Sequence, residues 1–411
     1  MKHLIKVLII FTLFSCSEND LQLNEDNPPN LRSLSNQELE LIAATNEFSF
    51  ELIKELDQLA ADENFFISPI SVGYALGMLF NGADGETKQG IKNTLDFGKL
   101  SDTEINKSYK NLTSLLLSMD NTVELGIANS VWYRNTLTVQ PNFANTINES
   151  YDAKIEGLDF NNPNAKDIIN NWIAEKTNDR IQDMLSSVPP EAVMYLVNAI
   201  YFKADWTYQF EESATDKAPF YLEDGTTQQV DMMFSEGATI SHAYTDNFQL
   251  IDIPYGNEQF VMTILLPNSD TGIADIWQSI SASQLRNLDE QSDTATVTLY
   301  LPKFELNYKK SLKAILSDMG MQKAFSDEAE LLNLFEESLN LKISDVIHQS
   351  FLKVDEKGSE AAAATIVEVG TTSVGGGEPQ KIKVDRPFGL MIRERHSGAI
   401  MFAGKMQDLS E

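Results

Sequence analysis

One segment near the C-terminus constrains the fold of this chain more than any other. Residues 355–366 read DEKGSEAAAATI. In an extended strand alternate side chains share a face, so Ser359, Ala361, Ala363 and Thr365 would form one small, uncharged side. Such a strand can enter a packed sheet, because it brings no bulky or charged side chain that would have to be buried. Composition alone fits a flexible linker or a short helix equally well.

The rest of the chain predicts one large α+β domain. Its 411 residues, 42% of them hydrophobic, contain no interior Pro/Gly-rich or strongly charged linker that would divide them. Hydrophobic periodicity predicts helices at 48–59, 70–80, 86–95, 103–118, 164–186, 273–287 and 309–319. Strands are expected at 123–133, 195–202, 228–234, 248–254, 260–266, 295–301, 341–354, 381–385 and 399–406. Helices before strands indicate several helices packed on large, mostly antiparallel sheets.

The N-terminus has the pattern of an export signal. Basic residues precede an apolar run that ends at Phe14 and is too short to span a bilayer as a mature helix. Residues 13–16, Leu-Phe-Ser-Cys, resemble a bacterial lipoprotein cleavage box, although Phe14 is bulkier than the usual residue there. We therefore assign 1–15 to a lipoprotein signal peptide and 16–40 to a lipidated Cys16 and a flexible tether.

Cys16 would then anchor the protein to a membrane. It is the only cysteine, so no disulfide within the chain is possible. The expected location is the bacterial cell envelope, on the outer membrane or the cell surface. An ordinary secretory signal is the alternative, and it would release a secreted protein.

Charge and motifs argue against several function classes. The chain has 61 acidic and 31 basic residues, a net charge of −30, which disfavours nucleic acid and anionic lipid headgroups as partners. No H-E-x-x-H, paired C-x-x-C or phosphate-loop pattern occurs, so metal and nucleotide chemistry lacks its ligands. Ser373 has Gly375 two residues after it but Thr371 two residues before it, and a nucleophile elbow would not form. We expect neither an enzyme nor a bound metal or cofactor.

The segment from Glu356 to Thr365 resembles the hinge of the serpin family, which reads Glu-x-Gly-Ser/Thr-Glu-Ala-Ala-Ala-Ala-Thr. Other serpin-like motifs follow the family order and extend the resemblance over about residues 42–408. They are Phe66–Ser71, Leu196–Lys203, Val230–Met233, Leu301–Phe304, Asp385–Phe388 and Ala403–Met406. The resemblance implies a single serpin domain at 41–411, with about eight to nine helices on three mostly antiparallel sheets and an exposed reactive loop at about 356–381.

The resemblance also implies roles for single residues. The hinge would comprise Glu356, Gly358, Ser359, Glu360, Ala361, Ala362, Ala363, Ala364 and Thr365. The region where the central sheet opens would comprise Ser68, Ser71, Asn198, Trp206, Lys303 and His348. In this region His348 is expected near Ser68, Ser71 and Asn198, and Lys303 is expected to pair with Glu356 at the top of the hinge. A buried histidine with no special role is the alternative for His348.

The implied function is irreversible, suicide-substrate inhibition of a protease. The target would attack the exposed loop and become esterified to it, and the cut loop would then insert into the central sheet and distort the attached enzyme. The expected partner is therefore a target protease in a covalent complex, and a monomer is expected. A non-inhibitory binding or carrier protein of the same fold at the cell envelope is the alternative, although such relatives tend to lose the small hinge residues retained here. A lipid-anchored structural protein of the cell surface is a third possibility.

The cut bond is expected at Thr372–Ser373, fourteen residues after Gly358, with Val369 and Thr371 as alternatives. Counting back from Pro387 gives a bond a few residues later, and we assign the extra length to residues 375–377, which are all glycine. The absence of Lys and Arg between Gly358 and Gln380 argues against a trypsin-like target. Elastase-like or subtilisin-like serine proteases fit better, and a papain-like cysteine protease also forms the acyl intermediate that such a trap needs.

Overall fold

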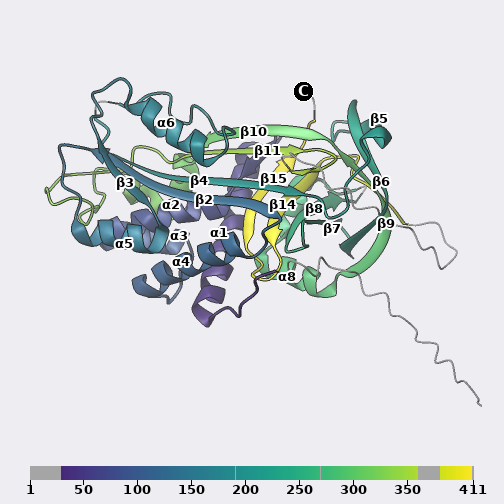
Figure 1. Cartoon of the computed structure of the whole chain (residues 1–411), viewed down its shortest axis with the longest axis horizontal. Helices are drawn as coiled ribbons and strands as arrows, with labels where there is room; N and C mark the ends of the chain where they lie inside the picture. The colour runs from purple at the N-terminus through teal and green to yellow at the C-terminus, as the bar shows by residue number, and fades with distance from the viewer. Residues whose placement is uncertain (1–28, 190, 269, 360–379, 410–411) are drawn as a thin grey trace, which may run out of the picture.

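The computed structural model describes residues 29–189, 191–268, 270–359 and 380–409. Nine α-helices lie within these ranges (Figure 1). They are α1 (Asn36–Leu59), α2 (Pro69–Gly82), α3 (Gly85–Thr94), α4 (Asp102–Ser118), α5 (Pro141–Tyr151), α6 (Ala165–Lys176), α7 (Ile273–Ser279), α8 (Ala282–Gln291) and α9 (Lys313–Leu316). None of the helices in the described ranges is long and apolar enough to cross a membrane.

Hydrogen bonds join the strands into two sheets. Their bounds are β1 (Phe65–Ile67), β2 (Val123–Arg134), β3 (Lys154–Leu158), β4 (Met194–Asp205), β5 (Asp216–Tyr221), β6 (Thr227–Tyr244), β7 (Phe248–Tyr255), β8 (Phe260–Pro267), β9 (Asp293–Pro302), β10 (Phe304–Ser311), β11 (Ile347–Val354), β12 (Gly358–Ser359), β13 (Gln380–Lys383), β14 (Phe388–Glu394) and β15 (Ile400–Met406). The central sheet has the order β10-β11-β12-β4-β2-β3. The second sheet has the order β1-β15-β14-β8-β7-β6-β9-β13, with β5 paired to β6.

Both sheets are antiparallel except for one strand pair in each, β2 with β3 and β9 with β13. The expected α+β fold on mostly antiparallel sheets is therefore confirmed. Three sheets were expected, but the 18-residue strand β6 merges two of them. It pairs with β5 and β9 along its first part and with β7 and β9 at its end, so the ladder continues past the bulge between Glu236 and Ala238.

The helices cover the central sheet on both faces. In Figure 1 α6 lies on one side of β2 and β4, while α2 and α5 lie on the other. A separate small core fills the space under α6, where Trp132 of β2, Trp172 of α6, and Val197 and Ala199 of β4 pack together. The larger core joins α1, α2 and the second sheet. The central sheet is thus packed on both faces, and a new strand could be added only within its plane.

Helix α1 begins earlier than the sequence periodicity indicated. Ser35 and Glu38 form a capping box, in which the Glu38 backbone N–H donates to Ser35 Oγ at 3.3 Å and the Ser35 N–H donates to Glu38 Oε2 at 2.7 Å. Residues 36–40, which were assigned to the flexible tether, therefore belong to the folded domain. The apolar periodicity did not indicate this earlier start, because a capping box fixes the beginning of a helix without any apolar pattern.

Other differences concern element boundaries. The helix expected at 164–186 ends at Lys176, because Asn178, Asp179 and Asp183 adopt positive φ angles that no α-helix contains. The helix expected at 273–287 is divided into α7 and α8, since Ser281 caps a second helix. The helix expected at 309–319 was wrong at its start, where β10 continues to Ser311. The strand expected at 341–354 begins only at Ile347. Helix α5 and the strands β1, β3, β5, β10 and β14 were not predicted.

Candidate functional site at the opening of the central sheet

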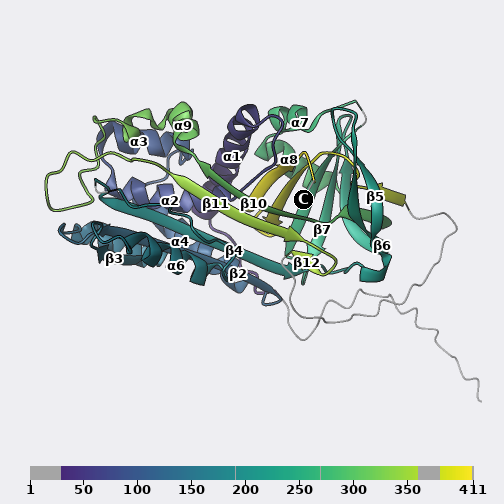
Figure 2. The ribbon, with the colours of Figure 1, turned by 90° about the horizontal axis from the view of Figure 1, so that it is seen from above.

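The start of the hinge already lies inside the central sheet. Strand β12 is antiparallel to both of its neighbours, with Ser359 opposite Val354 of β11 and opposite Ala204 of β4 (Figure 2). Beyond β12, no strand ladder joins β4 to β11 in the part of the chain that the structure describes. The sheet therefore holds one incompletely occupied strand position between β4 and β11, which we call the slot.

Gly358 fits this position only because it has no side chain. A Cβ atom there would lie 2.0 Å from the Ala204 carbonyl oxygen and 2.7 Å from the Asp205 Cα atom. Both of these are backbone atoms of β4, so they cannot rotate away. The hinge glycine therefore lets β12 approach β4 closely.

Ser359 is held by a buried aromatic pair. Its side chain is buried, and its Oγ atom lies 2.5 Å from the Tyr255 hydroxyl at the end of β7. The Tyr255 ring stacks on Trp206, with ring centroids 4.3 Å apart and ring planes 12° apart. Burial raises the pKa of Tyr255, so its hydroxyl stays protonated and shares a neutral hydrogen bond with Ser359.

Three successive hinge carbonyls accept hydrogen bonds from one short segment after β4. The Trp206 indole Nε1–H donates to the Asp355 carbonyl at 2.9 Å, and the Phe210 backbone N–H donates to the Glu356 carbonyl at 2.9 Å. The Trp206 backbone N–H donates to the Lys357 carbonyl at 2.7 Å. The turn between β11 and β12 is therefore fixed before the chain reaches Gly358.

Glu356 ties this turn to the neighbouring strands. Lys303, between β9 and β10, contacts its carboxylate at 2.8 and 3.0 Å, and the Thr215 hydroxyl donates to it at 2.8 Å. Burial alone would raise the pKa of Glu356, but the hydrogen bonds from Lys303 and Thr215 outweigh it and hold this pKa below its usual value. The structure thus brings the expected Lys303 and Glu356 together, and their role in sheet opening stays a prediction.

His348 lies on β11, on the side of the sheet that faces α2. Its Nε2 atom accepts a hydrogen bond from the Ser68 backbone N–H at 3.1 Å. Ser68 Oγ in turn accepts from the Ser71 N–H at 3.3 Å and donates to the Met401 carbonyl at 2.7 Å. Burial lowers the pKa of His348 to about 4, so the imidazole is neutral at physiological pH. His348, Ser68 and Ser71 therefore form one hydrogen-bonded group.

Asn198 belongs to a neighbouring network instead. Its Nδ2 atom donates to Asn129 Oδ1 at 2.7 Å, and Asn129 donates to the Tyr151 carbonyl at 2.7 Å. Among the described residues, its Oδ1 atom is buried and has no hydrogen-bond partner. His348 and Asn198 thus lie on the two strands that flank the slot. His348 is hydrogen-bonded to Ser68, and Asn198 is hydrogen-bonded to Asn129. An unpaired buried acceptor is costly.

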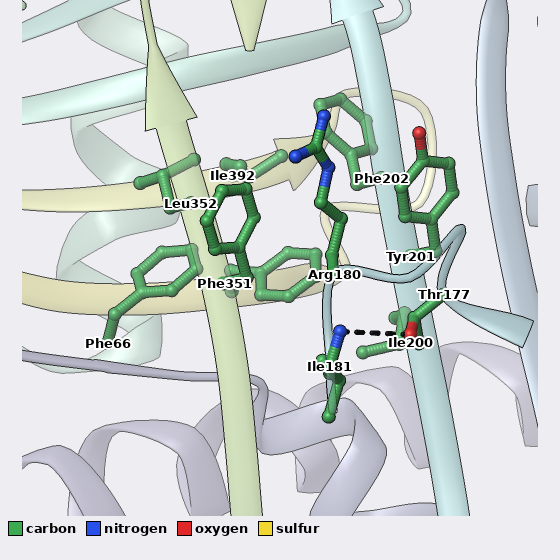
Figure 3. Close-up of a pocket in the computed structure, with 11 residues that line it drawn as sticks. Phe66, Thr177, Arg180, Ile181, Ile200, Tyr201, Phe202, Phe351, Leu352 and Ile392 are labelled. Atoms are coloured by element: carbon green, nitrogen blue, oxygen red, sulfur yellow. Dashed lines mark hydrogen bonds between the residues drawn. The ribbon is translucent and has the colours of Figure 1, made fainter. Parts of the chain in front are cut away.

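A small cavity of ≈ 20 Å³ lies further along the slot (Figure 3). Side chains of both flanking strands and of the segment after α6 line it. They are Phe351 and Leu352 of β11, Ile200, Tyr201 and Phe202 of β4, Thr177, Arg180 and Ile181, and, from other parts of the core, Phe66, Ile392 and Phe402. The slot is therefore closed by side chains rather than by strand pairing.

Several expected site residues lie outside the described residues. They are Cys16, Glu360, Ala361, Ala362, Ala363, Ala364, Thr365, Val369, Thr371, Thr372 and Ser373. The described part of the chain contains no group of three or more His, Cys, Asp or Glu side chains that could hold a metal ion.

Sequence reasoning missed Tyr255, Thr215, Phe210 and Arg180. Tyr255 ends an ordinary buried strand, and nothing in its neighbourhood along the chain indicates that this end reaches the hinge. Thr215 and Phe210 lie in the connection between β4 and β5. The path of this connection depends on tertiary packing and has no local sequence pattern. Only Arg180 lies next to a local signal in the sequence, because Asn178 and Asp179, which precede it, are typical of the end of a helix.

Comparison with known proteins agrees with this architecture. The family model described as serpin (serine protease inhibitor) matches residues 43–409. Iripin-2 of Ixodes ricinus is 33% identical over 380 residues, which are 91% of this chain and 94% of that protein. The leukocyte elastase inhibitor of Xenopus laevis is 32% identical over 89% of this chain and 98% of that protein.

The fold is similar to that of human thyroxine-binding globulin, with a TM-score of 0.83, 29% identity, and coverage of 91% of this chain and 100% of that chain. This likeness confirms the expected serpin architecture. With a family model over most of its length and a relative above 30% identity, the chain belongs to the serpin family.

Proposed function

We propose that this serpin is an irreversible suicide-substrate inhibitor that inserts its cut reactive loop into the slot between β4 and β11. The observation that carries the proposal is the position of β12, which pairs with both strands while no ladder joins them beyond it in the described residues. A chain that continues from Ser359 would need only to extend β12 to fill the slot. The first residues of the inserted strand are therefore already in register.

The chemistry of the trap belongs to the target protease. Its nucleophile attacks the carbonyl carbon of the scissile bond, an ester forms to the part of the loop that follows Gly358, and the new amino terminus on the other side leaves with a proton. The severed loop, still joined to β12, then enters the slot and carries the esterified protease with it. Distortion of the protease prevents water from completing the hydrolysis.

The hydrogen bonds of an added strand favour this step. An inserted run of about 12 residues, paired on both sides at a net 0.5 to 1.5 kcal/mol per bond, gains on the order of 10 kcal/mol before apolar burial is counted. Distorting a bound catalytic site costs a few kcal/mol, by the scale of local strain energies. A net gain of this size on insertion would exceed the cost of holding the protease in an inactive form.

We further propose Thr372–Ser373 as the cut bond and elastase-like or subtilisin-like enzymes as targets. The support is the lack of Lys and Arg between Gly358 and Gln380 and the small side chains at 369–373. A relative is a leukocyte elastase inhibitor, which is consistent with this choice. The similar fold of thyroxine-binding globulin, solved in complex with thyroxine, favours a carrier protein as the alternative.

Incubation with a panel of serine and cysteine proteases tests the proposal. We expect a band on denaturing electrophoresis at the summed mass of the serpin and one protease, and mass analysis of the released C-terminal fragment identifies the bond. Ser359→Arg is the control, because it would bury an unpaired charge beside Tyr255 and should turn the inhibitor into a substrate. Cleavage of the wild-type loop by every protease without any covalent band would favour the carrier alternative.

We propose that the mature protein is held at the bacterial cell envelope by lipid on Cys16. The support is the apolar run of the first 14 residues, the cleavage-box pattern at 13–16 and the polar segment after it. Mass analysis of the N-terminal peptide of membrane fractions should show a lipidated Cys16. An unmodified Cys16 within a soluble mature chain would contradict the anchor.

A further inference from the structure

The residues ahead of α1 are bound to the surface of the domain. The Asn30 backbone N–H donates to the Met119 carbonyl, at the end of α4, at 2.9 Å. The Arg32 guanidinium donates to the Asn111 carbonyl of α4 at 3.0 Å. We call the point where Asn30 meets Met119 the exit, because the part of the chain that carries Cys16 precedes it.

Arg32 also holds this segment to two other elements. Its guanidinium contacts the buried Glu38 carboxylate at the start of α1, at 2.5 and 3.1 Å. Its carbonyl accepts a hydrogen bond at 2.6 Å from Nε2 of His396, in the turn between β14 and β15. The exit is therefore at a fixed place on the domain.

The exit lies at the same end of the central sheet as the hinge. Strand β2 starts at Val123, four residues after Met119, and Val123 lies opposite Ala204 of β4. Ala204 in turn lies opposite Ser359 of β12 (Figure 2). Neighbouring strands are about 4.8 Å apart, so Val123 and Ser359 are about 10 Å apart.

Hydrogen bonds between the exit and the hinge fix this arrangement. The buried Asp120, between α4 and β2, accepts from the Thr122 N–H at 2.9 Å and from the Asn257 N–H, in the turn after β7, at 3.1 Å. Strand β7 ends at Tyr255, whose hydroxyl contacts Ser359. A short series of contacts therefore joins the exit to the start of the reactive loop.

The chain between the exit and the proposed lipid is short. Cys16 is 13 residues before Pro29. A chain of this length reaches about 45 Å at most, and a random coil of this length averages about 20 Å between its ends. A compact domain of about 370 residues is about 54 Å across when it is taken as a sphere. A lipid on Cys16 would therefore reach a membrane only from the side of the domain that carries the exit.

We propose that the anchored serpin holds its hinge end toward the membrane, and that it thereby selects proteases bound to the same membrane surface. The inference rests on the proposed function and on the proposed lipid on Cys16. A protease of about 275 residues is about 48 Å across, which exceeds the average gap of about 20 Å beneath the exit. A soluble protease is therefore hindered at the hinge end on the membrane side.

A membrane-bound protease does not meet this obstacle. It lies beside the serpin domain, on the surface toward which the hinge end is held. Confinement of both proteins to one surface also raises the effective concentration of each for the other. The expected partner is thus a protease that is itself anchored or adsorbed at the membrane.

Energy transfer from a single label to acceptor lipids tests the orientation. The lipidated full chain is placed in phosphatidylcholine vesicles with the donor on Ser118→Cys or on Leu332→Cys. Ser118 is exposed at the exit end of α4. Leu332 is 59% exposed, and its carbonyl accepts a hydrogen bond from Gln140, which follows β2 at the end of the strand away from Val123. Because the two labels differ in height by most of the domain width, we expect about threefold or more efficient transfer from position 118.

The rate at which the loop is cut tests the selection of the target. Subtilisin is supplied either in solution or bound to the same vesicles through a histidine tag and a nickel-chelating lipid. We expect the vesicle-bound enzyme to cut the anchored chain about tenfold or more faster than the soluble enzyme at the same total concentration. Soluble subtilisin should cut Cys16→Ser, which carries no lipid, about threefold or more faster than it cuts the anchored chain.

The matched control keeps the lipid and lengthens the chain ahead of the exit. An insertion of about 60 Gly and Ser residues after Asn24 extends the average reach to about 47 Å, close to the width of the protease. Soluble subtilisin should then cut the anchored chain at the rate of Cys16→Ser.

The outcomes separate this orientation from the inhibitory function, because cutting of the loop does not require insertion. If vesicle-bound subtilisin is preferred but denaturing electrophoresis shows no covalent band, the orientation stands and the proposed function is wrong. If a covalent band forms, but the two labels transfer energy equally or the two forms of subtilisin cut at equal rates, the proposal is overturned and the function stands.

Discussion

At the scale of single residues, His348 is expected to make stability depend on pH. Burial lowers its pKa to about 4, whereas the unfolded chain binds the proton near the ordinary value of 6.5. As the pH falls below 6.5, the unfolded state gains a proton that the folded state does not bind. The contribution of His348 to the free energy of unfolding should therefore be constant well above this value and should fall by about 3 kcal/mol between pH 6.5 and 4.

Chemical denaturation of the wild-type protein and of His348→Gln across this pH range measures the effect. Glutamine can still accept the Ser68 N–H bond, but it does not titrate. The stability difference between the two proteins should shrink by about 3 kcal/mol on going from pH 7 to pH 4. A difference that stays constant over this range would show that His348 is not buried in its neutral form.

The residues of the site were only partly predictable from sequence. Gly358, Lys303 and Glu356 lie in recognisable motifs, and the structure brings them to one end of the slot. Tyr255, which contacts Ser359, comes from a distant strand with no motif of its own. A contact between strand ends depends on how two sheets pack, and this packing leaves no local pattern in the sequence.

At the scale of elements, β12 depends on the absence of a side chain at position 358. In Gly358→Ala, the new Cβ atom would clash with the β4 backbone, so β12 should leave the sheet and the contact between Ser359 and Tyr255 should be lost. We expect the free energy of unfolding to fall by about 2 to 3 kcal/mol, at roughly 1 kcal/mol for each hydrogen bond lost.

Gly126→Ala is the matched control for this substitution. Gly126 lies on β2 of the same sheet, and a Cβ atom there would meet nothing nearer than 3.6 Å. Denaturation curves of both variants make the comparison. Equal stability of Gly358→Ala and Gly126→Ala would mean that β12 is not seated between β4 and β11.

Elements with a strong pattern were predicted well, and elements set by context were not. The apolar helix α2 and the strands β7 and β8 agree with their expected ranges to within one or two residues, because their side chains are almost all buried. Strand β3 has mixed polarity and pairs only at the sheet edge, so its five residues gave no period-2 signal. Strand β14 is buried throughout, but its charged residues Arg393 and Glu394 are typical of exposed positions, so the sequence did not indicate a buried strand.

Arg393 is stabilised by partners far along the chain, whereas Glu394 is stabilised within its own turn. Arg393 lies 3.1 Å from Asp252 of β7 and 2.6 Å from Asp289 of α8, and Glu394 accepts hydrogen bonds from Ser397. A buried charge with full pairing is tolerated inside a protein, but a sequence window registers it as a polar, exposed position. The tertiary pairing of Arg393 therefore left no signal of burial at this end of β14 in the sequence.

At the scale of the whole molecule, the proposed function requires a fold that has not reached its most stable form. The central sheet keeps an incompletely occupied position between β4 and β11, closed by side chains of both strands, of the segment after α6 and of the buried His348 group. The hinge enters this position at β12, where Ser359 lies opposite Val354 of β11. The strand that would complete the sheet is therefore expected to come from the same chain.

The most direct test of this claim is the melting temperature before and after the loop is cut between residues 360 and 379. Gaining on the order of 10 kcal/mol in a domain of this size corresponds to a rise of roughly 10 to 20 °C. The account predicts such a rise in the nicked protein, with its severed loop protected from further proteolysis. An unchanged or lower melting temperature, with the loop still open to proteolysis, would contradict it.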